Sequence, residues 1–112
     1  MKTDSQKAIE LLKTGNARFV SGALYQKADY AADRERLAEG QHPFAVVLCC
    51  SDSRVVPEIL FDQKLGDLFV IRNAGNVVDD DVLGSIEYAV EHLGAPLVVV
   101  LGHSCCGAVT AT

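Results

Sequence analysis

Residues 44–54 read Phe-Ala-Val-Val-Leu-Cys-Cys-Ser-Asp-Ser-Arg, and this stretch decides the fold. It begins with an unbroken apolar run, and residues 68–72 (LFVIR) and 96–101 (PLVVVL) are similar runs rich in β-branched side chains. Short apolar runs without polar alternation are typical of strands that are covered on both faces, as in a parallel sheet. We therefore expect three buried strands in one sheet.

The segments around these runs predict helices. Residues 79–94 (DDDVLGSIEYAVEHLG) begin with acidic residues, which suit a helix N-terminus, and carry an apolar stripe at helical spacing. Strand, helix and strand in this order form a right-handed βαβ unit. Earlier in the chain we expect helices over 5–20, where Gly15 is unfavourable, and over 32–40, with a packed loop at 21–32. The predicted fold class is α/β, with a mostly parallel central sheet flanked by helices.

Length and composition restrict the class of protein. The chain has 112 residues, 49% of them hydrophobic and 22% charged, which suits one globular domain. A net charge of −5 without a Lys/Arg cluster argues against a nucleic-acid partner. No apolar stretch approaches the roughly 20 residues that span a bilayer, and the start lacks the apolar core of a signal peptide. We expect a cytoplasmic protein with no membrane partner, in which the cysteines are reduced.

The predicted organisation is a single domain over 1–112. Its N-terminal helices lie at about 5–40 and its α/β core, which carries the site described below, at about 44–112. Only eleven residues follow the third apolar run, enough for a turn and two helical turns. We therefore expect a fold that is short at its C-terminus, with one side of the sheet left without its covering helix.

Sulfur, imidazole and carboxylate groups follow the first and third runs. Cys50 ends the first expected strand (44–50) and Asp52 follows it, while His103 and Cys106 follow the third. Ligands gather at the carboxyl ends of parallel strands, so these two clusters should meet at one edge of the sheet. Two thiolates, an imidazole and a displaceable carboxylate suit a catalytic Zn²⁺ site, in which water can take the fourth position.

The cysteines also have a simpler interpretation. A cysteine at a strand end is more often a small core residue than a ligand. Successive strand residues point to opposite faces, so only one of Cys49 and Cys50 can face the site.

Several motifs in this chain resemble those of the β-class carbonic anhydrases. The two most specific are Cys50-Ser51-Asp52-Ser53-Arg54 and Gly102-His103-Ser104-Cys105-Cys106-Gly107-Ala108. The similarity also includes Gln41-x-Pro43, Arg72-Asn73-Ala74-Gly75-Asn76 and Ile86-Glu87-Tyr88-Ala89-Val90, and it extends from about residue 5 to the last residue. The family's C-terminal portion has no counterpart in this sequence.

The resemblance implies a set of site residues. One zinc ion per chain is held by Cys50, His103 and Cys106, with Cys49 and Cys105 as packing neighbours. Asp52 and Arg54 correspond to the catalytic dyad, and in some members the aspartate also binds the metal. The substrate pocket, formed across a dimer interface, involves Gln41, Phe69, Ala74 and Tyr88. In addition, the backbone N–H of Gly107, at an expected helix start, suits an anion such as bicarbonate.

The function that the resemblance implies is that of a lyase, the zinc-dependent reversible hydration of carbon dioxide to bicarbonate and a proton through a zinc-bound hydroxide. It also implies a homodimer or a higher homo-oligomer with sites at the interface. Two alternatives remain open. One is hydrolysis of a CO₂ analogue, carbonyl sulfide or carbon disulfide, on the same ligand set. The other is a truncated chain that binds zinc and oligomerises without useful turnover.

Overall fold

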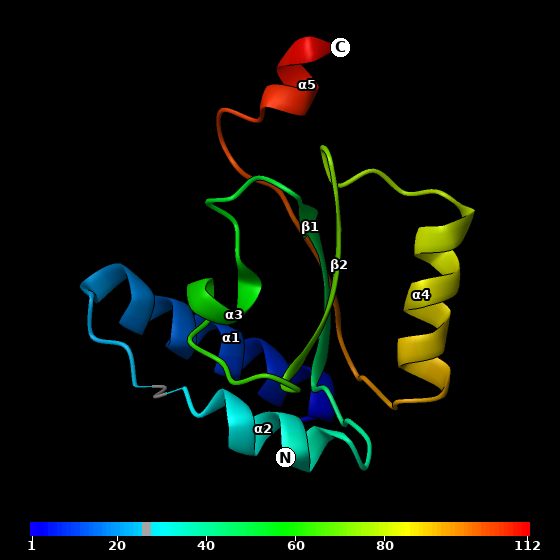
Figure 1. The fold of residues 1–112 in the computed structure, drawn as a ribbon. Helices are drawn as coiled ribbons and strands as arrows, with labels where there is room; N and C mark the ends of the chain where they lie inside the picture. Colours follow the sequence, from blue (N-terminus) through cyan, green and yellow to red (C-terminus); the bar gives the residue numbers. More distant parts are fainter. Residues whose placement is uncertain (26–27) are drawn as a thin grey trace.

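A parallel three-stranded sheet with the strand order β2-β1-β3 is the centre of the fold. The computed structural model describes residues 1–25 and 28–112, so two residues of the loop expected over 21–32 lie outside the described part. In Figure 1, α1 and α3 lie on one side of the sheet, α4 on the other, and α5 beyond the carboxyl ends of the strands. The strands are β1 (Ala45–Cys50), β2 (Leu68–Asn73) and β3 (Val98–Leu101), and the helices are α1 (Asp4–Ser21), α2 (Tyr30–Leu37), α3 (Pro57–Leu60), α4 (Asp80–Glu91) and α5 (Gly107–Ala111). The predicted α/β class with a parallel sheet between helices is confirmed.

All six residues of β1 are buried, because β1 is the central strand and both of its faces are covered. Ala45, Val47 and Cys49 pack with Leu12 of α1 in one core cluster. Val46, on the other face, packs with Ala89 of α4 in a second cluster. The alternation of a strand thus divides the core into two layers, one on each side of β1.

Strand β3 departs from the expectation that all strands are covered on both faces. Val99 and Leu101 pack against the core on the side of α1, but Val98 and Val100 are 40% and 62% exposed. Helix α4 packs on β1 and β2, and within the described residues no element covers the same side of β3. The expectation of two covered faces is therefore correct for β1 and wrong for β3, and the shortage of cover expected on one side of the sheet is found here.

Helix α1 lies unusually close to the segment that follows α3. A Cβ atom added to Gly15 would come within 1.7 Å of the carbonyl oxygen of Phe61. Asn16 donates a hydrogen bond to the Leu60 carbonyl at 3.0 Å, and Arg18 pairs with the buried Asp62 at 2.5 Å. Gly15, which looks unfavourable from helix propensity alone, is therefore required for this close approach.

Two local features differ from the expectations. The helix expected over 32–40 spans Tyr30–Leu37, because the side chain of Asp29 caps its start by accepting from the Ala32 N–H at 3.1 Å. Helix α3 was not expected, because four residues are too few to show helical periodicity. None of the described helices is both long enough and apolar enough to cross a lipid bilayer.

Candidate metal centre

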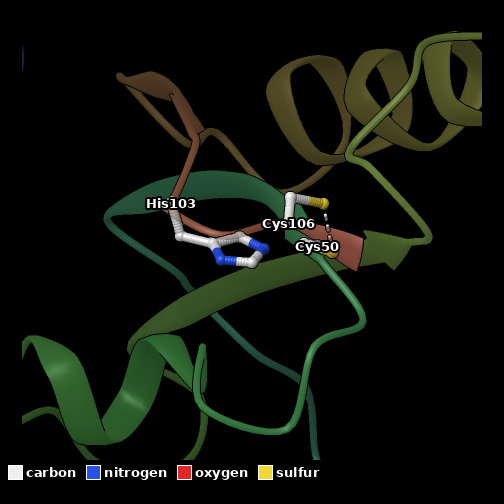
Figure 2. Close-up of side chains that lie close together, drawn as sticks. All are labelled: Cys50, His103 and Cys106. Carbon is white, nitrogen blue, oxygen red and sulfur yellow. Dashed lines mark hydrogen bonds between the residues drawn. The ribbon is translucent and has the colours of Figure 1, made fainter. Parts of the chain in front are cut away.

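Three potential metal ligands from two distant parts of the chain meet beyond the carboxyl ends of β1 and β3. Cys50 ends β1, while His103 and Cys106 lie in the connection from β3 to α5. One ligand atom from each residue lies within 4.8 Å of the other two. Figure 2 shows the imidazole ring of His103 directed toward the two cysteine side chains. The neighbouring strands β1 and β3 thus bring these residues to the edge of a parallel sheet where ligands usually bind.

The two sulfur atoms have a separation that fits a metal site. The Sγ atoms of Cys50 and Cys106 lie 3.8 Å apart. With Zn–S bonds of about 2.3 Å and a tetrahedral angle, two sulfur ligands of one zinc ion stand about 3.8 Å apart. A disulfide has an S–S bond of about 2.05 Å, and all four cysteines of the chain are free thiols.

The hydrogen bonds of His103 leave one ring nitrogen available to a metal. Nδ1 lies 2.9 Å from the carbonyl oxygen of Ser104, so Nδ1 carries the hydrogen and donates it there. Nε2 is buried and has no hydrogen-bond partner, the only such side-chain nitrogen or oxygen among the described residues. A ligating histidine typically donates its second ring N–H to a carbonyl in this way. The residues therefore fit a metal with two thiolates and one imidazole nitrogen as ligands.

The thiol of Cys50 is surrounded by groups that favour its charged form. The backbone N–H groups of Gly75 and Asp52 donate to its Sγ at 3.3 and 3.4 Å. The pKa of Cys50 falls to about 6, chiefly through the Gly75 N–H, with further contributions from His103 and the Asp52 N–H. In turn, the Cys50 thiolate raises the pKa of His103 above its usual value. These groups therefore favour the thiolate form of Cys50, which is the form that binds metals.

Asp52 lies beside this cluster but is not one of the residues whose ligand atoms converge. Its carboxylate accepts two hydrogen bonds from the Arg54 guanidinium, at 3.0 and 2.9 Å, and one from the Arg54 backbone N–H at 2.9 Å. Arg54 also donates to the carbonyl of Cys105 at 3.2 Å and so links the two site loops. These hydrogen bonds hold the pKa of Asp52 far below its usual range. The expected dyad is therefore assembled, with the aspartate paired to arginine.

The other two cysteines lie apart from the cluster. Cys49 is fully buried in the core beneath α1, where burial raises the pKa of its thiol. Cys105 is exposed and has a positive φ of 56°, a conformation that non-glycine residues rarely adopt. The structure thus places one member of each pair in the cluster and the other outside it.

The residues expected around the substrate fall into two groups. Ala74 follows β2 at the carboxyl end of the sheet, and Gly107 begins α5 next to Cys106. Gln41 precedes β1, and Phe69 lies opposite Val46 near the start of the strands. Four residues of parallel strand separate that level from Cys50, a rise of about 13 Å.

Tyr88 belongs to the second group. Its ring lies 6.0 Å from that of Phe69, and it is 47% exposed. Within one chain, therefore, only Ala74 and Gly107 of the five expected substrate residues lie next to the metal-ligand cluster.

Arg72 is a residue of this site to which the sequence analysis assigned no role. It donates hydrogen bonds to the carbonyl oxygens of Cys50 and Asp52, at 3.0 and 2.7 Å. The signal available in the sequence was a single charged residue at the end of the apolar run LFVIR. The Gly75 N–H was missed for a different reason, since a glycine with φ 80° after a strand looks like an ordinary turn.

A hollow of about 210 Å³ borders the cluster. Arg54 and His103 form its polar part, and Val55, Leu60 and Leu101 form its apolar wall. The centre is therefore accessible to a small molecule from this side.

Comparisons with known proteins agree on one family. The family model for carbonic anhydrase matches residues 45–112. A carbonic anhydrase of Mycolicibacterium smegmatis is 58% identical over 94% of this chain, and carbonic anhydrase 2 of Mycobacterium tuberculosis is 55% identical over 97%. The alignments cover 51% and 53% of these two relatives, so the chain spans about half of their length.

Solved structures give the same result for the fold. The β-carbonic anhydrase CcaA matches with a TM-score of 0.67 and 36% identity, over 97% of this chain and 52% of that one. Tetrameric β-carbonic anhydrases from Sordaria macrospora match with a TM-score of 0.64 and 35% identity, over 90% and 51%. A carbon disulfide hydrolase matches more distantly, with a TM-score of 0.57 and 27% identity, over 69% and 43%.

Proposed function

This chain belongs to the β-carbonic anhydrase family, and we propose that it carries the zinc site of an enzyme that converts carbon dioxide and water reversibly to bicarbonate and a proton. The observation that carries the proposal is the convergence of Cys50, His103 and Cys106, with their ligand atoms within 4.8 Å of one another and with Nε2 of His103 unpartnered. In this proposal each chain holds one zinc ion, and residues 1–112 act as a single domain. Free thiols as ligands favour a reducing compartment, so we place the protein in the cytoplasm.

The chain's own residues have distinct roles in this reaction. Cys50, His103 and Cys106 hold the metal, which when bound supplies the Lewis acidity that activates water near neutral pH. Asp52 is ionised over the working pH range because Arg54 lowers its pKa, so its carboxylate only accepts hydrogen bonds. It therefore accepts a hydrogen bond from the O–H of the attacking water and orients the oxygen, while Arg54 fixes Asp52 through two parallel bonds. The Gly107 N–H is available to the bicarbonate product.

The positions of the substrate residues favour an oligomer with shared sites. Gln41, Phe69 and Tyr88 lie toward the amino ends of the strands, and Cys50 lies at the carboxyl end of β1. They line the same pocket as Ala74 and Gly107 only if another copy of the chain supplies them. We therefore propose a homodimer or a larger homo-oligomer, a form also found in the tetrameric relatives from Sordaria macrospora.

A second candidate reaction uses the same ligands. The similarity to a carbon disulfide hydrolase favours hydrolysis of a linear CO₂ analogue, carbon disulfide or carbonyl sulfide, as the alternative. The two activities share the need for an activated water and differ in which linear substrate the pocket admits.

Stopped-flow measurement of CO₂ hydration tests the proposal. The protein is loaded with one equivalent of zinc and compared with Cys50→Ala and with the matched variant Cys49→Ala. We expect hydration above the buffer rate for the parent and for Cys49→Ala, and none for Cys50→Ala.

Each other outcome has a defined meaning. Full zinc occupancy without hydration would contradict the proposed reaction and leave a zinc-binding chain without turnover. Release of sulfide from carbon disulfide by that same inactive preparation would favour the analogue hydrolase. Failure of the parent to bind zinc would contradict the metal site itself.

A further inference from the structure

The strand β1 ends at Cys50, a proposed metal ligand, and the loop that follows carries Asp52 beyond the end of the sheet ladder. Cys50 is the last residue of β1, and the final backbone bond to β2 runs from the Ser51 N–H to the Asn73 carbonyl at 2.8 Å. Beyond that point the carbonyls of the loop have no strand partner. The segment that follows Cys50 therefore depends on other contacts to hold its backbone.

Arg72 holds this segment, together with the Val55 N–H, which donates to the Asp52 carbonyl at 3.0 Å. Its Nε donates to the Cys50 carbonyl at 3.0 Å and its Nη2 donates to the Asp52 carbonyl at 2.7 Å. These two carbonyls flank the peptide whose N–H, that of Asp52, donates to Cys50 Sγ. One guanidinium thus fixes both ends of the short segment that shapes the thiolate's surroundings.

Arg72 does this from the side of the sheet opposite to the Cys50 side chain. It lies opposite Cys49 in the register of β1 and β2, and its strand neighbour Val70 packs in the cluster beneath α1. By strand alternation the Cys50 side chain points to the other face. Both hydrogen bonds that Arg72 donates to this site go to backbone carbonyls, and so its influence on the Cys50 thiol acts through the backbone.

We propose that Arg72 is a positioning residue of the metal centre, which sets the zinc affinity by clamping the Cys50 and Asp52 carbonyls. The inference rests on the metal site of the proposed function. The planar fork of arginine places two donors in a fixed relation, which a single lysine ammonium does not reproduce. Partners in the outer shell of a metal site typically change affinity about 10- to 100-fold when they are removed.

The test compares Arg72→Gln and Arg72→Lys with the parent, and uses Arg34→Gln and Arg34→Lys as matched controls. Arg34 is an exposed residue of α2, which lies at the other end of the sheet (Figure 1). Two quantities are measured: the zinc dissociation constant, by competition with a chelator, and hydrogen exchange of the Asp52 and Arg54 amides in the metal-free protein. Circular dichroism verifies that the variants are folded. We expect them to fold because the Arg72 side chain is exposed.

We expect both Arg72 variants to bind zinc about 10- to 100-fold more weakly than the parent. Their Asp52 and Arg54 amides should exchange about tenfold faster, because the loop loses its charged hydrogen-bond donors. The Arg34 variants should match the parent in both measurements. An unchanged Arg72→Gln variant would overturn the inference.

Three further results are informative. Recovery of parent values in Arg72→Lys would show that charge alone suffices and would overturn the two-carbonyl clamp. Faster exchange with unchanged zinc affinity would overturn the role in the metal site. A parent protein that binds no zinc would contradict the proposed function, and the exchange rates would then decide whether Arg72 holds the loop.

Discussion

The two cysteine pairs look alike in the sequence, but different forces decide which cysteine of each pair joins the cluster of potential metal ligands. Cys49 and Cys50 belong to a strand buried on both faces, so alternation sends one thiol into the core beneath α1 and the other into the site. Cys105 and Cys106 lie in a loop, where no such alternation exists. There the chain turns at Cys105, which adopts the left-handed backbone conformation and whose carbonyl accepts a hydrogen bond from Arg54.

The difference shows how reliably local rules place a ligand. In the strand pair, the pleat and the core together determine the direction of each side chain. In the loop pair, the direction depends on a turn and on a contact with a residue 51 positions earlier in the chain. The first pair should therefore respond to substitution through burial, and the second through backbone conformation.

The largest contrast is expected for metal binding within each pair. In Cys50→Ala the zinc affinity should fall by more than roughly 100-fold, because a ligand itself is removed. Removal of an outer-shell contact lowers the affinity by about 100-fold at most. Cys49→Ala should keep its zinc and lose about 1 kcal/mol of unfolding free energy, because it leaves a small cavity in the core. In the same way, Cys106→Ala should lose its zinc and Cys105→Ala should keep it. Zinc titration and urea denaturation measure these effects, and release of zinc by Cys49→Ala would refute the assigned register.

A smaller contrast concerns the ionisation of Cys49 and Cys50 in the metal-free protein. The Gly75 N–H and its companions lower the pKa of Cys50 to about 6, whereas burial raises the pKa of Cys49. As pH rises, the thiolate of Cys50 should therefore form near pH 6, and that of Cys49 only above the usual pKa of a thiol. Thiolate absorbance in the ultraviolet, compared between the parent and Cys50→Ala, measures this step. If the titration step that disappears in Cys50→Ala had its midpoint near pH 9 in the parent, the stabilised thiolate would be contradicted.

The smallest effect is expected at Cys105. Its φ of 56° suits glycine and is unfavourable for β-branched residues, so Cys105→Val should be about 1–2 kcal/mol less stable than Cys105→Gly. The substituted side chain is exposed, so a loss of packing does not explain such a difference. Urea denaturation of the two variants at saturating zinc measures it. Equal stability would show that the turn is not constrained in this conformation.

Much of the fold follows from patterns within single segments. The apolar runs located all three strands, and the acidic start and apolar stripe located α4, because burial on both faces and helical amphipathicity leave local traces. The convergence of Cys50, His103 and Cys106, with Asp52 beside them, could be predicted because the carboxyl ends of parallel strands meet at one edge.

The features that the sequence analysis missed depend on contacts between distant segments. The two carbonyls that Arg72 holds lie 22 and 20 residues before it, and no local pattern encodes such a pairing. Gly15 is unfavourable within a helix, and only the backbone of Phe61 explains it. The expectation that β3 is covered on both faces failed for a related reason, because an apolar run does not show which neighbouring elements will pack on it.

The attachment of α1 has a consequence for the order in which the chain can fold. Asn16 and Arg18 bind residues 44 positions later, and Leu12 packs on the central strand. Helix α1 therefore makes its contacts with the core only through segments that follow it in the chain, from β1 to Asp62. Closing so long a loop costs entropy before any contact repays it, and such non-local contacts slow folding. Helix α1 thus depends on later segments for its docking, and the central strand β1 is the surface that receives it.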